Sequence, residues 1–301
     1  MHIRPLLAGA TGLALLGLAT SAAAHAVVGN RFFPATLATD DPGVADELSL
    51  PTVSAFRTGD DPALRELDVS GEWSKRLTRD LGVSFGETWT RLKSPDSGTA
   101  RGFQNLETTL KYQMLVSPEH EAMLAAGVSY EWGGSGADRV GAERQSTVTP
   151  TVYFGKGAGD LPDGLGWARP FAVTGLVGYG LPTRARGPDG LNPQVLSWGL
   201  AVEYSLPYLA AHVKDLGLPQ VLNQLTPIVE ASFERPVVRG AGGRTTGTIN
   251  PGVIWSGRHF QLGAEATLPI NRDSGRGAGF LVQVHLFIDD LFPRSLGKPI
   301  W

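Results

Sequence analysis

The sequence of 301 residues contains no cysteine. Disulfide bonds, thiolate metal sites, thiol catalysis and a lipidated cysteine are therefore not expected. Beyond the first 26 residues there is also no run of 18 apolar residues, which argues against a helical membrane protein. Lysine and arginine number 26 against 29 aspartates and glutamates, and they form no basic tract. This charge pattern argues against nucleic acid as a partner.

The first 26 residues have the organisation of a secretion signal. His2 and Arg4 form a short polar start, residues 6–18 are apolar, and small residues follow over 22–26. We therefore expect residues 1–26 to be a signal peptide that is removed on export. An uncleaved N-terminal anchor is the alternative.

The remaining chain alternates apolar with polar or small residues over lengths of about ten residues. In one such segment Leu67 and Val69 alternate with Asp68 and Ser70. A strand places alternate side chains on opposite faces, so each segment has one apolar and one polar face. Twelve segments show the pattern, the first least regularly: residues 52–58, 67–77, 81–92, 102–115, 122–132, 146–156, 170–181, 194–205, 226–236, 248–256, 259–270 and 278–287.

The connections between these segments favour an up-and-down barrel. If the N-terminus is periplasmic, the connections at 78–80, 116–121 and 257–258 lie on the periplasmic side and are short. The opposite connections are longer and rich in glycine, aspartate and arginine, as in outer-membrane barrels. Two periplasmic connections, at 157–169 and 207–225, are long exceptions, and the apolar spacing of the second predicts a short amphipathic helix. An ordered loop under the barrel is the alternative.

The sequence thus predicts an all-β fold, a transmembrane antiparallel up-and-down β-barrel of about twelve strands at residues 52–287. Residues 27–51 lack a strand period and form an N-terminal periplasmic arm, either docked or a disordered linker. Residues 288–301 form a periplasmic C-terminal tail. Phe287, at the end of the last strand, is interpreted as the aromatic signal for the barrel assembly machinery. Outer-membrane lipid is the expected surrounding.

Eleven ionisable residues fall on the polar, inward face of the predicted strands. Acids outnumber bases among them, so an open lumen would favour cations or neutral polar solutes. The alternative is that the charges pair across a narrow barrel and fill it. These candidates for lining the lumen are Asp68, Glu72, Arg76, Glu107, Lys111, Glu131, Glu203, Glu230, Glu234, Glu265 and His285.

Two charges contradict the pattern of the third segment. Glu87 and Arg91 fall on its apolar face, where a charge at the middle of a bilayer costs about 2–4 kcal/mol. A β-bulge near Gly86 would rotate both side chains inward.

Catalytic and metal-binding motifs are weak. The sequence has no Gly-x-Ser-x-Gly motif, and only His259 and His285 lie in the predicted strands. The acidic run at 40–47 lacks the spacing of a calcium loop, and no glycine-rich segment forms a phosphate loop. We therefore expect no cofactor, no metal site and no enzyme activity.

Three segments of the chain resemble outer-membrane barrel transporters of proteobacteria, a group similar to barrels linked to phenol meta-pathway degradation. These segments are GNRFFPATLATDDPGVADELSLP, LPYLAAHVKDLGLPQVLNQLTPIVE and FLVQVHLFIDDLFPRSLGKPIW. The resemblance implies a barrel and solute uptake, and it brings no functional residue and no substrate. The sequence therefore predicts passive transport or binding of small, unidentified solutes across the outer membrane. A barrel lipid hydrolase and a soluble periplasmic β carrier are the alternatives.

Overall fold

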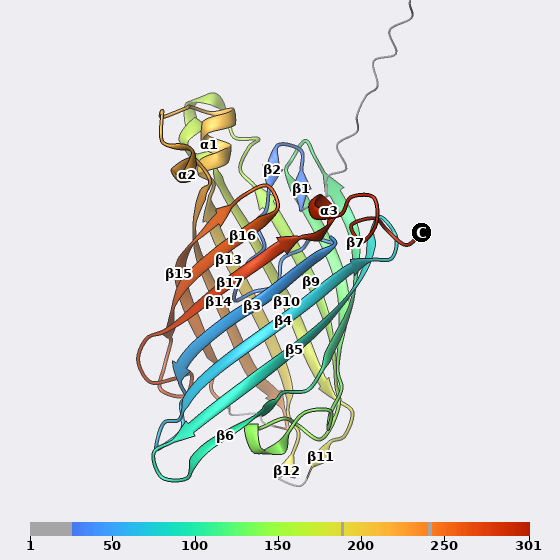
Figure 1. Ribbon diagram of the computed structural model, residues 1–301, viewed down its shortest axis with the longest axis vertical. Coiled ribbons are helices and arrows are strands. Elements are labelled where there is room, and N and C mark those ends of the chain that lie inside the picture. The colour runs from blue at the N-terminus through green and yellow to red at the C-terminus, as the bar shows by residue number, and fades with distance from the viewer. Residues whose placement is uncertain (1–25, 188–189, 240–242) are drawn as a thin grey trace, which may run out of the picture.

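The computed structural model describes residues 26–187, 190–239 and 243–301, and nearly all of the predicted signal peptide lies outside this part of the chain. Twelve antiparallel strands form one closed barrel, in which each strand pairs with its neighbours in sequence (Figure 1). The pairing of β17 with β3 joins the two ends of the chain and closes the ring. The barrel strands are β3 (Glu47–Arg57), β4 (Arg65–Arg76), β5 (Leu81–Ser94), β7 (Glu107–Ser117), β8 (Ala122–Glu131), β9 (Thr147–Gly157), β10 (Phe171–Pro182), β13 (Gln194–Tyr204), β14 (Leu225–Val238), β15 (Thr246–Ser256), β16 (Phe260–Pro269) and β17 (Gly279–Phe287).

All twelve predicted segments are strands of the barrel, with two differences. The first strand begins at Glu47, five residues earlier than predicted, because the register shift between Ser49 and Thr52 interrupts its alternation. The predicted strand at 102–115 is divided into β6 (Gly98–Phe103) and β7. β5 pairs with β6 in its outer half and with β7 in its inner half, and residues 104–106 lie between.

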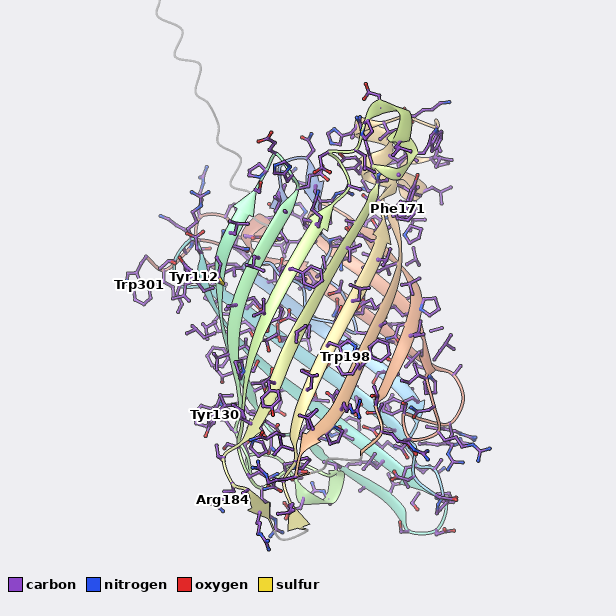
Figure 2. The ribbon with its side chains drawn as sticks, turned by 180° about the vertical axis from the view of Figure 1, so that it is seen from behind. Tyr112, Tyr130, Phe171, Arg184, Trp198 and Trp301 are labelled. Carbon is purple, nitrogen blue, oxygen red and sulfur yellow. The ribbon has the colours of Figure 1, made fainter. Side chains whose placement is uncertain are left out.

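The outer surface of the barrel is apolar, as a surface in contact with lipid must be. Large hydrophobic side chains from successive strands are exposed on it, among them Leu110, Val152, Val177 and Leu262. Aromatic side chains lie toward both ends, with Tyr112 and Phe171 near one rim and Tyr130 near the other (Figure 2). This arrangement matches the interfacial preference of aromatic rings.

Short helices and both ends of the described chain gather at one end of the barrel (Figure 1). There η2 (Asp163–Ala168) follows β9, and the predicted helix is present as α1 (Leu206–His212) and α2 (Gln220–Asn223). Ser205 caps α1 by accepting a hydrogen bond from the Tyr208 backbone. Short turns and the termini mark this end as periplasmic. None of the described helices has the length and apolarity needed to cross a membrane.

Smaller elements complete the fold. β1 (Val27–Val28) and β2 (Arg31–Phe32) form a hairpin at the periplasmic end, and α3 (Ile288–Leu291) follows β17 there. β11 (Arg186–Gly187), β12 (Gly190–Leu191) and η1 (Asp138–Val140) belong to loops at the opposite, extracellular end.

The predicted bulge near Gly86 is wrong. β4 and β5 pair without any register shift from Arg65 opposite Lys93 to Arg76 opposite Gly82, so nothing rotates β5. Glu87 and Arg91 therefore stay on the outward side. The irregularity lies instead in the partner strand, between β6 and β7.

A charge placed on the outward face at mid-strand tests this orientation. Val152→Arg would put a cation into lipid at the centre of β9, and we expect a loss of about 2–4 kcal/mol in the free energy of unfolding. Ser129→Arg on the inner face of β8 is the control and should cost less than half as much. Urea unfolding in phospholipid vesicles measures both, and equal losses would contradict the orientation.

Candidate functional site

The N-terminal arm, residues 26–46, enters the barrel from its periplasmic end and turns back inside the lumen (Figure 1). Its entrance is fixed by Arg31, which is fully buried. The Arg31 Nε donates to Glu121 at 3.1 Å, its Nη1 donates to the Pro170 carbonyl at 3.0 Å, and its guanidinium lies 3.9 Å from the Tyr208 ring centre. Arg31 thus connects the arm to the β7–β8 turn, to the segment before β10 and to α1.

The tip of the arm is fixed by Glu230, a fully buried residue of β14. Its carboxylate accepts hydrogen bonds from the backbone N–H groups of Leu37, Ala38 and Thr39 at 2.6, 3.0 and 2.7 Å. The Thr39 hydroxyl donates to the same carboxylate at 2.8 Å. One side chain of the wall thus accepts hydrogen bonds from three successive backbone N–H groups that are shielded from water. These bonds hold the tip in one conformation.

Apolar contacts press the arm against one wall. Leu37 packs on a cluster of buried wall residues that includes Ile228 and Ile254. Gly263 of β16 faces Leu37, and a Cβ there would lie 2.5 Å from a Leu37 methyl carbon. Gly199 of β13 would meet a Thr39 methyl group in the same way. These glycines give the arm room to approach the sheet.

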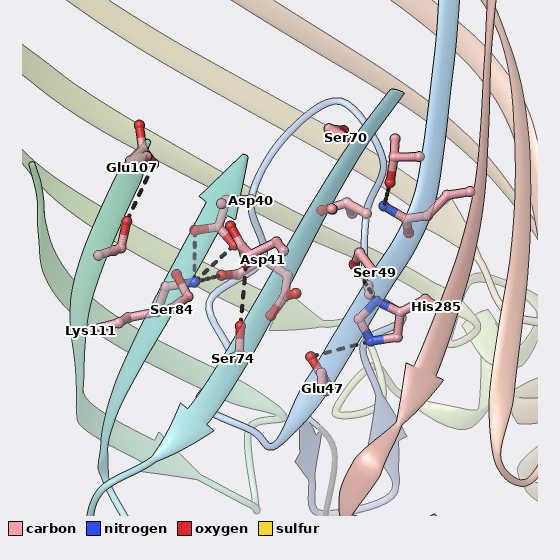
Figure 3. Close-up of a pocket in the computed structure, with 18 of the residues that line it drawn as sticks. Asp40, Asp41, Glu47, Ser49, Ser70, Ser74, Ser84, Glu107, Lys111 and His285 are labelled. Atoms are coloured by element: carbon pink, nitrogen blue, oxygen red, sulfur yellow. Dashed lines mark hydrogen bonds and ion pairs between the residues drawn. The ribbon is translucent and has the colours of Figure 1, made fainter. Parts of the chain in front are cut away.

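The opposite wall is left open, and between it and the arm lies a cavity of about 500 Å³. The cavity is lined by the arm and by β3, β4, β5 and β7, together with Glu131 of β8 and His285 of β17, and its side chains are mostly carboxylates and hydroxyls (Figure 3). Lys111 is its principal cation. The Lys111 ammonium donates to Asp40 at 2.8 Å and to the Asp41 carbonyl at 2.9 Å, and it lies 4.4 Å from the Tyr153 ring centre.

A second cavity of about 410 Å³ lies on the other side of the arm tip. Ser197, Glu234 and Thr246 line it from the extracellular halves of β13, β14 and β15. Ala38, Thr39 and Asp40 belong to the lining of both cavities, so the arm tip is their common wall. The tip therefore borders both spaces.

The eleven lumen candidates fall into two groups. Some line a cavity, and others occupy the interior in contacts with the arm, the tail or neighbouring strands. The cavity group is Glu72, Glu107, Lys111, Glu131, Glu234 and His285. The other five make contacts within the protein. Asp68 accepts a hydrogen bond from Thr90, Arg76 forms an ion pair with Asp46, and Glu230 binds the arm tip. Glu203 and Glu265 are buried.

Sequence reasoning missed the arm residues of the site, above all Asp40 and Arg31. The sequence shows the run of acids at 40–47, but a segment without alternation gives no sign that it lies inside the barrel. The arm was predicted only as periplasmic, docked or disordered. Among the residues that the structure describes, no group of three metal-binding side chains is arranged to hold an ion.

A row of three polar side chains crosses the closing seam of the barrel. The His285 Nδ1 lies 2.8 Å from the Ser49 Oγ, and its Nε2 lies 3.3 Å from Glu47 (Figure 3). His285 and Ser49 are direct cross-strand partners of β17 and β3. The imidazole presents Nδ1 to the serine and Nε2 to the acid, the reverse of a serine-hydrolase triad. The row therefore ties the first strand to the last.

At the periplasmic rim, Asp46 joins the end of the arm to the C-terminal tail. Its carboxylate accepts from the Lys75 ammonium at 2.6 Å and from the Arg76 Nε at 2.7 Å. Lys75 also donates to the carbonyls of Leu296 and Lys298 in the tail. The tail is thus held on the rim beside the arm.

No protein-family model matches the chain, and no curated protein matches its sequence. Solved structures match its fold. An outer-membrane channel from Pseudomonas putida F1 is similar over 85% of this chain and 99% of its own, at 12% identity and a TM-score of 0.52. The KdgM porin is similar over 78% and 98%, at 12% identity and 0.45, and the NanC porin over 78% and 97%, at 9% and 0.47. The fold is that of an outer-membrane β-barrel.

Replacing the Glu230 carboxylate should release the arm. In Glu230→Ala the tip loses its shared acceptor, and a hydrogen bond to a charged group contributes about 1.5–3 kcal/mol. We expect a single thiol introduced by Ala35→Cys to react with a maleimide more than about tenfold faster in this background. Glu234→Ala, on the same face of β14, is the control. Equal labelling rates in all three proteins would refute the clamp.

The tail should loosen as the pH rises. Burial, assisted by the negative charge of Glu47, raises the pKa of Asp289 from 3.8 to about 8, while Arg76 opposes the shift. The folded state then favours the protonated acid, so its stability falls between pH 4 and pH 8 and levels off above. Asp289→Asn should remove this part of the pH dependence. Proteolysis of the tail at pH 5 and pH 9 measures it, and identical slopes in both proteins would exclude Asp289 as the cause.

Proposed function

We propose that the protein is a bacterial outer-membrane channel for the passive transport of small solutes. The observation that carries this proposal is the pair of cavities inside a closed barrel, which share the arm tip as part of their lining. In this proposal, displacement of residues 38–40, which line both cavities, opens the route for a solute. The fold shared with an outer-membrane channel supports the same reading.

The lining supports small cationic or neutral polar solutes. Glu72, Glu107 and Glu131 project into the large cavity, whereas Lys111 is already paired with Asp40. A lumen with uncompensated carboxylates attracts cations and repels anions. Hydroxyl groups such as those of Ser70 and Ser84 can hydrogen-bond neutral solutes.

The proposed solutes include small aromatic compounds of the phenol type. We include them because the barrels that the chain resembles are linked to phenol degradation, and because the apolar side chains of Leu37 and Val44 in the cavity lining can contact an aromatic ring. Delivery by the barrel assembly machinery through Phe287 is likewise proposed. Phe287 is buried against Phe32, so the assembly machinery would recognise it before the arm enters the barrel.

Neither alternative fits as well. A lipid hydrolase would need its nucleophile at the lipid surface, but the Ser49–His285 pair faces the lumen. His259 lies in the periplasmic turn before β16, where its carbonyl accepts from the Phe287 backbone. A soluble carrier would not expose an apolar belt around its whole barrel.

Conductance in planar bilayers tests the channel. Wild-type protein should show small, cation-selective openings, and deletion of residues 34–41 should raise the single-channel conductance severalfold. Glu72→Gln with Glu107→Gln should lower the cation selectivity, because two lumen charges are removed. Swelling of proteoliposomes with small sugars, amines and phenol then separates the solute classes.

One control variant and one refuting outcome complete the test. Glu119→Gln removes an exposed acid of the β7–β8 turn that lines neither cavity, and it should leave the selectivity unchanged. A barrel that is correctly folded but carries neither ions nor solutes, even without residues 34–41, would overturn the proposed function.

A further inference from the structure

Five cationic side chains gather on the outside of the barrel at its extracellular end. Arg57 of β3 lies directly opposite Arg65 on the neighbouring strand β4, and Arg65 lies opposite Lys93 of β5. Arg91 of β5, two residues from Lys93 toward the middle of the barrel, lies directly opposite Arg101 of β6. These strands run side by side in Figure 1, and their extracellular ends lie on its lower left side. We call this set the basic rim patch.

The strand register places all five side chains on the lipid side. Ser70 lines the lumen cavity, so the odd-numbered positions of β4 at this end, Arg65 and Leu67, face outward. Cross-strand partners share a face, which places their partners on β3 and β5 outside as well. On β6 the outward neighbour of Arg101 is Phe103, whose side chain is 55% exposed.

The break between β6 and β7 creates half of this arrangement. In β7 the inward positions are odd-numbered, as Glu107 and Lys111 show. An unbroken strand would therefore have turned Arg101 and Phe103 into the lumen. The residues between β6 and β7 reverse the alternation and set Arg101 opposite Arg91 instead.

Such a cluster is costly without an anion. Like charges directly opposite each other on neighbouring strands destabilise a sheet. None of the five cations forms an ion pair with a carboxylate in the described part of the chain. The nearest acid on the same face of β5, Glu87, is four residues from Arg91, or roughly 13 Å along the strand. A bound anion would relieve the repulsion.

The surface next to the patch identifies the kind of anion. Leu67, Trp89 and Phe103 continue the same strands toward the middle of the membrane on the same face. A ligand that fits both parts is therefore amphiphilic, with phosphates at the rim and acyl chains below. Arginine matches this role because its guanidinium binds phosphate oxygens in a bidentate manner.

We propose that the basic rim patch binds the phosphorylated glucosamine headgroup of lipopolysaccharide in the outer leaflet. This inference rests on the proposed location in the outer membrane with the long loops outside. The phosphates lie between the Arg65–Lys93 row and the Arg91–Arg101 row, and the acyl chains lie along Leu67, Trp89 and Phe103.

Native mass spectrometry of the folded protein in detergent tests the site. The probes are bisphosphorylated lipid A, the same lipid without phosphates, phosphatidylglycerol and inorganic phosphate. We expect one lipid A to bind at least about tenfold more tightly than its dephosphorylated form, and Arg65→Gln with Arg101→Gln to abolish that preference. Arg184→Gln with Arg186→Gln, an equal loss of charge in another extracellular loop, should retain it.

The outcomes separate the sources of phosphate. Equal binding of phosphatidylglycerol or of inorganic phosphate would show a general anion surface and overturn the lipopolysaccharide site. Equal affinity of the two double variants would overturn the role of the patch. Gel mobility before and after heating confirms that each variant is folded, and planar-bilayer conductance of the same samples shows separately whether the channel function holds.

Discussion

The whole molecule depends on the requirement that every backbone donor and acceptor in lipid finds a partner within the protein. A closed ring of antiparallel strands meets it, and the ring is complete only when β17 pairs with β3. This seam carries additional side-chain support, because His285 bonds Ser49 across it. The seam also contains the register shift between Ser49 and Thr52, where the regular ladder is interrupted.

The same requirement applies to the arm inside the lumen. An extended segment has no ladder of its own, so its N–H groups need acceptors from the wall. Glu230 supplies them for the tip and Gln261 donates to the Ala35 carbonyl. Burying a charged residue in the wall is therefore the means by which a segment without secondary structure is held in one place. What remains of the lumen is divided into two cavities of moderate size.

Much of the fold was predictable because the lipid imposes a period of two on every strand. Twelve segments, the loop asymmetry and the α1 helix followed from that period and from spacing. The start of β3 was missed because the register shift between Ser49 and Thr52 interrupts its alternation. The break after Phe103 was missed because a one-residue irregularity leaves hydrophobicity almost unchanged while it reverses the face of each side chain. For Glu87 and Arg91 the sequence pattern was right about the face, and the predicted bulge was wrong.

By itself, the sequence determined that the chain forms a barrel with an apolar exterior and a polar, mainly acidic interior, since alternation is a local property of each strand. Only the tertiary structure decided which inward charges meet solvent and which meet protein. Glu72 and Glu230 have the same residue type and the same face, yet one lines a cavity and the other holds the arm. The difference arises because the arm, almost 200 positions away from Glu230 in sequence, packs on one wall and leaves the other open. No local pattern encodes that choice.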